Sequence, residues 1–226
     1  MKTTMIAIAA MTLLAGCALL ATGADEQAEG ELLFRADFSD GKMDGWWVEG
    51  GEKVWVEDGR LHVKANPPEA KMPGDVATVW YKTPFEGDIE IRFDAHVVAS
   101  AIEANNINFF FHYTHPEEGK TIWDTREERA DAGYRKYHVL NGYIITFLND
   151  FHKETEPWPD GTRKSRMRMR RCPGFQLVNE TFDYHCKIGQ TYNCRIIKKG
   201  GKLEFWVDGK KYLEHEDPNP WNGGLI

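Results

Sequence analysis

Hydrophobic and polar residues alternate along most of the chain after residue 31. In residues 88–97 the alternation is unbroken, with Ile, Phe, Ala or Val at every second position and mostly charged residues between them. A period of two places alternate side chains on opposite faces of a β-strand, so this segment predicts a half-buried strand. Further strands are expected at 32–38, 53–56, 60–64, 77–81, 107–113, 143–148, 166–170, 192–198, 202–207 and 210–213.

The expected strands are joined by turns and not by helices. The pairs Asp58-Gly59 and Asp208-Gly209 each predict a tight hairpin, because both residues accept the positive φ angles that such a turn needs. Residues 125–132 predict only a short surface helix without an apolar stripe. Many short strands without crossover helices predict an all-β chain, folded as an antiparallel β-sandwich of the jelly-roll type.

The first residues predict export. Lys2 precedes an apolar run at 5–14 that is too short to span a bilayer, and residues 14–17 (Leu-Ala-Gly-Cys) resemble a bacterial lipobox. That resemblance implies cleavage before Cys17 and lipid on its sulfur, whereas an ordinary signal peptide with an incidental cysteine is the alternative. We expect a signal peptide at 1–16, lipidated Cys17 with a flexible tether to residue 31, and one sandwich domain at 32–226. The protein is then lipid-anchored to the cell envelope, in the periplasm or at the outer membrane or cell surface.

Charge and cysteine content narrow the function. A net charge of −7 argues against general binding of nucleic acid, although it allows a local basic site. An odd number of cysteines follows Cys17, so at least one is unpaired; either Cys186 pairs with Cys194 across a hairpin or Cys172 pairs with Cys186. Neither Cys-x-x-Cys nor a helical His-x-x-x-His accompanies them, so no zinc site is expected.

The last residues resemble the beginning of another strand. Residues 221–226 carry a turn signal followed by only two apolar residues. We therefore expect the chain to lack its closing strand, which would expose a sheet edge.

Several segments resemble the concanavalin A-like lectin/glucanase superfamily: 38–47, 55–61, 203–209, 217–218 and 223–226. The resemblance implies a lectin-like sandwich and says little about activity. Residues 141–149 and 166–175 are similar to an uncharacterised galectin-like bacterial family found beside genes for pectin and rhamnogalacturonan degradation. This likeness implies a carbohydrate setting. Cys172 stands where related sequences would carry Asn before Pro-Gly-Phe, so it is given no sugar-binding role.

Polar and aromatic side chains on two expected strands suit a sugar. Asn106, Asn108 and His112 alternate with apolar residues, so they are expected on one face beside Phe110. Amides and imidazole bind sugar hydroxyls, and aromatic faces stack on pyranose rings. In the alternative interpretation, His112 is a histidine at the edge of the core with a hydrogen-bond partner.

Arginines recur at every second position of 166–170, with methionines between them. On a strand, Arg166, Arg168 and Arg170 share one face at intervals of about 6.6 Å. They could grip successive carboxylates or sulfates, each through two hydrogen bonds. Alternatively, they form a solvated row that pairs with the abundant Asp and Glu.

A β-elimination site is also consistent with these residue types. Tyr143 and Asn149 are expected on one face of their strand, and His138 precedes it. Abstraction of the C5 proton of a uronate needs a base close to a group that neutralises the carboxylate. Tyr143, His112 or His138 would be the base, and Arg166 or Arg168 would neutralise the carboxylate.

Other sites are less favoured. Glycoside hydrolysis needs paired carboxylates, and the pairs Glu90/Asp94 and Glu204/Asp208 have a suitable spacing but are expected to be solvated. No cofactor is expected. Acids in a turn-rich segment could hold a structural calcium ion, but we interpret these acids as solvated. Those acids are Asp37, Asp40 and Asp44.

Tryptophans expected in loops could stack on sugar, or the first two could close the end of the sandwich: Trp46, Trp47, Trp123 and Trp158.

Together these features predict an exported β-sandwich that binds or processes polysaccharide, most plausibly an acidic plant or algal glycan. The expected binding residues are Asn106, Asn108, His112, Tyr143, Asn149, Arg166 and Arg168. Lyase action with Tyr143, His112, His138 and Arg168 is the alternative, followed by a glycoside hydrolase or a non-catalytic envelope interaction module whose sheet is covered by apolar side chains. The expected partners are a glycan and, through the lipid only, a membrane.

Overall fold

The computed structural model describes residues 30–65, 76–100, 105–151, 159, 161 and 165–226. The chain divides into two compact units, residues 1–35 and residues 36–226. The architecture described below is that of the second unit. Among the described residues, no helix has the length and apolar character needed to cross a bilayer.

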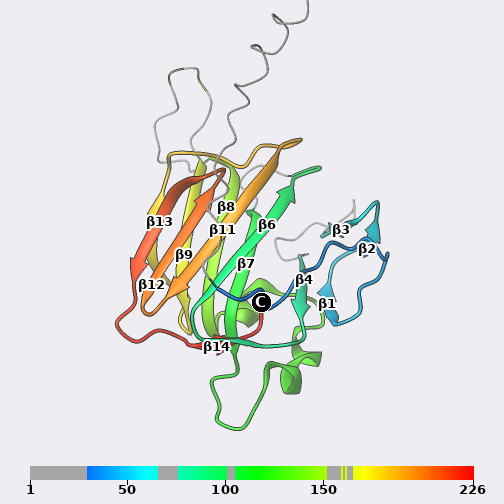
Figure 1. Cartoon of the computed structure of the whole chain (residues 1–226), viewed down its shortest axis with the longest axis vertical. Coiled ribbons are helices and arrows are strands. Elements are labelled where there is room, and N and C mark those ends of the chain that lie inside the picture. The colour runs from blue at the N-terminus through cyan, green and yellow to red at the C-terminus, as the bar shows by residue number, and fades with distance from the viewer. Residues whose placement is uncertain (1–29, 66–75, 101–104, 152–158, 160, 162–164) are drawn as a thin grey trace, which may run out of the picture. The chain divides into compact units, whose positions relative to one another are not determined.

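Two four-stranded antiparallel sheets form a sandwich (Figure 1). The first sheet has the order β10-β9-β8-β7, with β7 at Asn105–Thr114, β8 at Asn141–Phe151, β9 at Ser165–Cys172 and β10 at Gln176–Thr181. The second has the order β13-β12-β11-β6, with β6 at Ile89–His96, β11 at Thr191–Lys199, β12 at Lys202–Val207 and β13 at Lys210–Glu216. The predicted all-β antiparallel sandwich is confirmed.

Three two-stranded pairs complete the described strands. They are β1 (Trp46–Gly50) with β4 (Ala77–Tyr81), β2 (Lys53–Glu57) with β3 (Arg60–Lys64), and β5 (Phe85–Glu86) with β14 (Gly223–Gly224). Both Asp-Gly hairpins form as predicted, with φ of 51° and 67° at Asp58 and Gly59, and 50° and 77° at Asp208 and Gly209.

The main core lies between the two four-stranded sheets. It takes alternate residues from each strand, including Met167 and Met169 of β9 and Cys194 and Ile196 of β11. A second apolar cluster, built around Trp80, lies on the other face of the first sheet. Two 3-10 helices contribute to that cluster, η1 at Ile122–Thr125 and η3 at Tyr134–Tyr137. A third, η2, lies between them in sequence at Glu127–Arg129. This outer covering decides which part of the first sheet a ligand can reach.

The structure corrects several local predictions. Residues 32–38 form no strand, and residues 125–132 form short 3-10 helices instead of one α-helix. Trp46 and Trp47 belong to β1 and Trp123 to η1, so none of these three lies in an open loop. β1 is stabilised by its pairing with β4, which is distant in sequence. Local alternation carries no information about such a partner.

The cysteine pairings do not form. Cys172, Cys186 and Cys194 are all buried free thiols. Cys172 belongs to the second apolar cluster, whereas Cys186 and Cys194 belong to the core between the sheets. Burial raises the pKa of all three thiols, which keeps them protonated and poorly reactive.

Candidate ligand-binding face

A row of polar side chains crosses the outer face of the first sheet. Asn108, Thr146, Arg168 and Glu180 are register neighbours on β7, β8, β9 and β10. They point away from the core because Met167, which precedes Arg168, points into it. The Thr146 hydroxyl donates a hydrogen bond to Asn108 Oδ1 at 3.0 Å. We call this surface, with Arg166 and Arg170 on either side, the arginine face.

The arginine face carries more positive than negative charge. Among the described side chains, Glu180 is the one carboxylate that pairs with these arginines, at 3.4 Å from Arg166 Nη1. Arg168 Nη2 donates to the neutral Asn105 Oδ1 at 3.0 Å, and Arg170 Nη1 donates to the Phe175 carbonyl at 2.9 Å. Burial and the two flanking arginines lower the pKa of Arg168 to about 10. Such partly desolvated, like-charged guanidiniums favour an anionic ligand.

Aromatic rings border the arginine face. His138 stacks on Phe175 with ring centroids 3.6 Å apart, and Tyr134 meets both rings edge-on, at 4.7 Å from His138 and 5.7 Å from Phe175. The Arg170 guanidinium lies 4.0 Å from the centre of the Phe175 ring. These rings give the face an apolar border beside its charged centre, the combination that a sugar acid requires.

The pKa values of two titratable groups at this border are shifted in opposite directions. Burial, together with Arg170 and Arg135, lowers the pKa of His138 to about 4, so its ring is uncharged at neutral pH. Burial raises the pKa of Tyr134, and this effect exceeds the lowering by Thr146, Arg168 and the other polar neighbours. Both groups are therefore uncharged at neutral pH.

Several polar atoms here are buried without a hydrogen-bond partner among the described residues. They are Tyr134 OH, His138 Nε2 and the Nε atoms of Arg166, Arg168 and Arg170. Leaving such an atom unsatisfied costs about 1–3 kcal/mol. The three arginines therefore have donors that no described residue satisfies.

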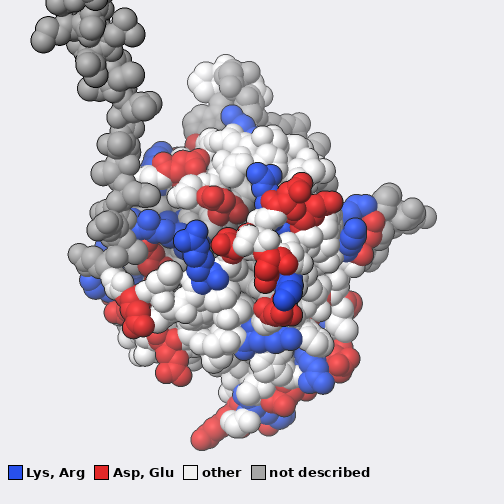
Figure 2. Space-filling model, turned by 45° about the vertical axis from the view of Figure 1, so that its right-hand side comes forward, with Lys and Arg blue, Asp and Glu red and all other residues white. Residues whose placement is uncertain are grey.

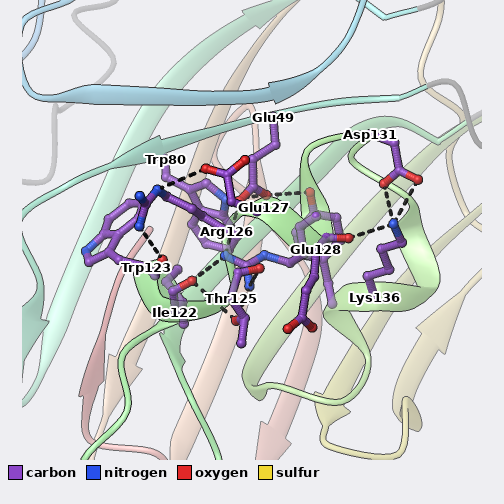
Figure 3. A network of polar contacts seen from close by, with 12 residues as sticks. Glu49, Trp80, Ile122, Trp123, Thr125, Arg126, Glu127, Glu128, Asp131 and Lys136 are labelled. Carbon is purple, nitrogen blue, oxygen red and sulfur yellow. Dashed lines mark hydrogen bonds and ion pairs between the residues drawn. The ribbon is translucent and has the colours of Figure 1, made fainter.

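A buried ion pair fixes the segment that carries Tyr134. Glu49 of β1 accepts a hydrogen bond from Trp80 Nε1 at 3.1 Å (Figure 3). It also accepts from Arg129 Nη2 at 3.1 Å and from the Tyr137 hydroxyl at 2.7 Å. Arg129 also donates to the carbonyl of Ile122 at 2.6 Å. The ion pair therefore ties η1, η2 and η3 to β1 and β4.

The structure brings together only part of the predicted site. Arg166, Arg168 and Asn108 share the outer face as predicted. A β-bulge between Asn105 and Ile107 turns Asn105 toward Arg168, while Asn106 instead donates to the Cys186 carbonyl at 3.1 Å. The prediction that Asn106 lies beside Asn108 is therefore wrong, since an inserted residue breaks the alternation.

His112 and Tyr143 also lie elsewhere. A second bulge and a φ of 54° turn His112 into a fully buried position, where Nδ1 lies 3.2 Å from the Trp221 carbonyl. Tyr143 is fully buried in the core between the sheets and donates to Asp217 at 2.7 Å. The face prediction for His112 is corrected, and Tyr143 points away from Arg168. His112 matches the alternative interpretation of a core-edge histidine with a partner.

Some predicted residues lie outside the described part. They are the Asn149 side chain, Trp158 and Cys17. Conversely, four residues at this face were not expected there from the sequence: Asn105, Tyr134, Thr146 and Phe175. Alternation in 143–148 does place Thr146 on the face of the strand that Tyr143 does not occupy. No local pattern indicates that Tyr134 or Phe175 would pack beside Arg170.

The carboxylate pairs considered for hydrolysis are engaged as anions. Glu90 pairs with Arg195 at 2.9 Å and also with Arg92. Lys202, Trp206 and Lys211 donate to Glu204 and lower its pKa to about 2, against the effect of burial. A general acid needs a raised pKa, which neither Glu90 nor Glu204 has.

Paired charges are common elsewhere on the surface. Figure 2 shows a face on which Lys and Arg side chains lie beside Asp and Glu side chains. Two of the three loop acids considered for calcium cap their own turns: Asp37 accepts from Ser39, and Asp40 accepts from the Lys42 amide. In the described residues, no group of three or more His, Cys, Asp or Glu could hold a metal ion.

Comparisons place this fold among known proteins. Residues 73–226 match the profile of a family described as Domain of unknown function (DUF6250). A solved protein of unknown function with a galectin-like fold from Bacillus subtilis is 20% identical, with a TM-score of 0.65 and 88% of each chain covered. A carbohydrate-binding module, CBM66 from Bacillus subtilis, is 10% identical, with a TM-score of 0.49, covering 80% of this chain and 84% of the module. No curated protein sequence matches the chain. The likeness to the Bacillus subtilis protein of unknown function shows that the sandwich is galectin-like.

Proposed function

Because the chain belongs to this family of unknown function, its role has to be inferred from its site, and we propose that the arginine face binds an acidic carbohydrate. The observation that carries the proposal is the row of Arg166, Arg168 and Arg170, with one paired carboxylate among the described side chains and buried guanidinium nitrogens that lack partners. Arginine binds carboxylate and sulfate through two parallel hydrogen bonds.

The surroundings of the arginines favour a sugar over a simple anion. Asn105 and Asn108 offer amide groups for sugar hydroxyls, and Phe175 presents a half-buried ring near them. Flat rings next to planar polar groups match the alternating apolar and polar surface of a pyranose. A uronate or sulfated glycan has both the anion and the ring that this face accommodates.

The binding test compares polygalacturonate with neutral galactan by titration calorimetry. We expect saturable binding of polygalacturonate that weakens with salt and much weaker binding of galactan. Arg168→Gln should weaken polygalacturonate binding about tenfold or more, and Arg168→Lys should recover only part of the loss because Lys lacks the planar fork.

Arg60→Ala is the matched control, since it removes the same charge from an exposed position in β3. It should leave the affinity unchanged. Equal losses for Arg60→Ala and Arg168→Gln, or equal binding of the two glycans, would contradict the proposal.

We further propose that the domain acts outside the cytoplasm, tethered through lipid on Cys17. The support for this is the charged and apolar pattern of residues 2–17, which is that of a lipoprotein signal. Tethering would keep a glycan-binding face at the cell envelope, where polymeric glycans arrive.

A further inference from the structure

We propose that Arg170 is a second anion-binding position on the arginine face, oriented by Phe175, so that the face selects a glycan with at least two acidic groups. The proposal rests on the proposed binding of an acidic carbohydrate. It goes beyond that function by giving the ligand a minimum number of charges and by giving Phe175 a positioning role.

The Arg170 guanidinium is held by a single residue. Its Nη1 atom donates a hydrogen bond to the Phe175 carbonyl at 2.9 Å, and its Cζ atom lies 4.0 Å from the centre of the Phe175 ring. The hydrogen bond orients one edge of the planar guanidinium, and the ring attracts the cation and restrains its position. Arg170 is therefore ordered before a ligand arrives, which lowers the entropy cost of binding.

Phe175 is fixed in turn by its surroundings. The His138 ring stacks on it with centroids 3.6 Å apart, and the Gly174 amide donates to the His138 carbonyl at 3.0 Å. Phe175 lies in the turn between β9 and β10 with a φ of 57°, which bulky residues rarely adopt. Such a conformation persists only where neighbouring contacts hold it, and here it places both the ring and the carbonyl of Phe175 against Arg170.

Arg170 keeps a donor that a ligand can reach. Its Nη2 atom is not buried and makes no hydrogen bond with a described residue. Among the described side chains, no carboxylate forms an ion pair with Arg170. The outer edge of this guanidinium is therefore available to one carboxylate or sulfate group.

Arg168 provides a separate position. Its Nη2 atom donates to Asn105 of β7 at 3.0 Å, whereas its Nη1 atom is not buried and makes no hydrogen bond with a described residue. β8 lies between β9 and β7, so Arg168 extends toward β7 while Arg170 turns toward the β9–β10 turn. The two residues are about 6.6 Å apart along the strand. Arg170 adds to the effect of burial in lowering the pKa of Arg168, and two anions would relieve this repulsion better than one.

The first experiment compares trigalacturonate with galacturonic acid on the full chain, by titration calorimetry for the trimer and by NMR titration for the weaker monomer. We expect the trimer to bind at least about tenfold more tightly. Arg170→Gln should weaken trimer binding about tenfold and remove most of this preference. Loss of affinity in Arg168→Gln but not in Arg170→Gln would overturn the second position and leave the proposed function intact. Absence of binding to every acidic glycan would overturn both.

The second experiment tests whether Phe175 acts through Arg170. Phe175→Leu should weaken trigalacturonate binding about 3- to 10-fold in the wild type and have no further effect in Arg170→Gln. Phe175→Tyr keeps the ring and should keep the wild-type affinity. Urea unfolding checks that each variant is folded. Where Phe175→Leu is not, Phe175→Met gives the same comparison, because Met fills the volume without an aromatic ring.

Tyr212→Leu is the matched control. It removes a half-buried ring from β13 that contacts Lys210, with Nζ 4.5 Å from the ring centre, so it deletes the same kind of contact on the other sheet. It should leave the affinity for trigalacturonate unchanged. An equal loss from Phe175→Leu with and without Arg170, or the same loss in Tyr212→Leu, would contradict the positioning role.

Discussion

At the scale of single residues, burial decides what each histidine does. His112 is fully buried, and burial with the nearby Lys198 lowers its pKa to about 4. Lys198 is also buried, where it donates to Asn222 Oδ1 at 2.6 Å and to the Gly87 carbonyl at 3.2 Å. His112 thus belongs to a polar cluster that holds the last residues of the chain against β5 and β11, and it has no role at the arginine face.

The lowered pKa of His112 predicts a loss of stability in mild acid. Unfolding returns the pKa to about its ordinary 6.5, so between pH 6.5 and about 4 the unfolded chain binds more protons than the folded chain. The free energy of unfolding therefore falls as pH falls through this window, by up to about 1.4 kcal/mol per pH unit for one histidine. Urea unfolding at a series of pH values measures the slope.

His112→Asn should reduce that slope, while His138, whose pKa is also lowered to about 4, keeps part of it. Carboxylates such as Glu204, with a pKa lowered to about 2, add their own acid dependence only as pH falls below their ordinary 4.5. A slope above pH 4.5 that is the same in His112→Asn and in the wild type would contradict this assignment.

At the scale of elements, the segment from η1 to η3 depends on the ion pair beneath it. Its 3-10 helices have three or four residues each and little stability of their own. Glu49 and Arg129 are almost fully buried, at 0% and 3% side-chain exposure, so their pairing holds the segment and the Tyr134 ring that it carries. The order of the aromatic border of the arginine face therefore depends on β1, a strand that the alternation did not predict.

Glu49→Gln should destabilise the protein by about 3–5 kcal/mol, because it keeps the shape of the side chain but leaves Arg129 as a buried, uncompensated charge. Urea unfolding monitored by tryptophan fluorescence measures the loss. Glu52→Gln is the matched control, since the pair of Glu52 with Lys64 at 2.7 Å is largely solvated and should contribute about 1 kcal/mol or less. Similar losses for the two variants would show that the buried pair does not fix the segment.

At the scale of the whole molecule, a local basic row coexists with a net charge of −7. The negative total opposes non-specific binding of polyanions, so the proposed binding of an acidic glycan would depend on the arginine face. The proposed tether would set where this face works, by holding residues 36–226 at a membrane surface.

Cys17→Ser should abolish lipid attachment and shift the protein from the membrane fraction to the soluble fraction, because the thioether requires that sulfur. Labelling with radioactive palmitate in a bacterial host, followed by fractionation, measures both effects. Cys194→Ala, which removes a buried thiol of the core, is the control and should keep the label. Label retained in Cys17→Ser would contradict the lipoprotein assignment.

The sequence by itself determined the sandwich and the arginine row. Alternation is a local property, so it places Met167 and Met169 inside and Arg168 outside without knowledge of any neighbour. The Asp-Gly hairpins are equally local, because φ preferences belong to the two residues of the turn.

Only the tertiary structure decided which side chains meet that row. β-Bulges lie at 105–107 and 111–114, and an inserted residue moves the following side chains to the opposite face. Asn105 therefore faces Arg168 in place of Asn106, and His112 points inward. Tyr134 and Phe175 reached the face through packing around Trp80 and the Glu49–Arg129 pair, contacts between segments more than 30 residues apart that leave no local periodicity.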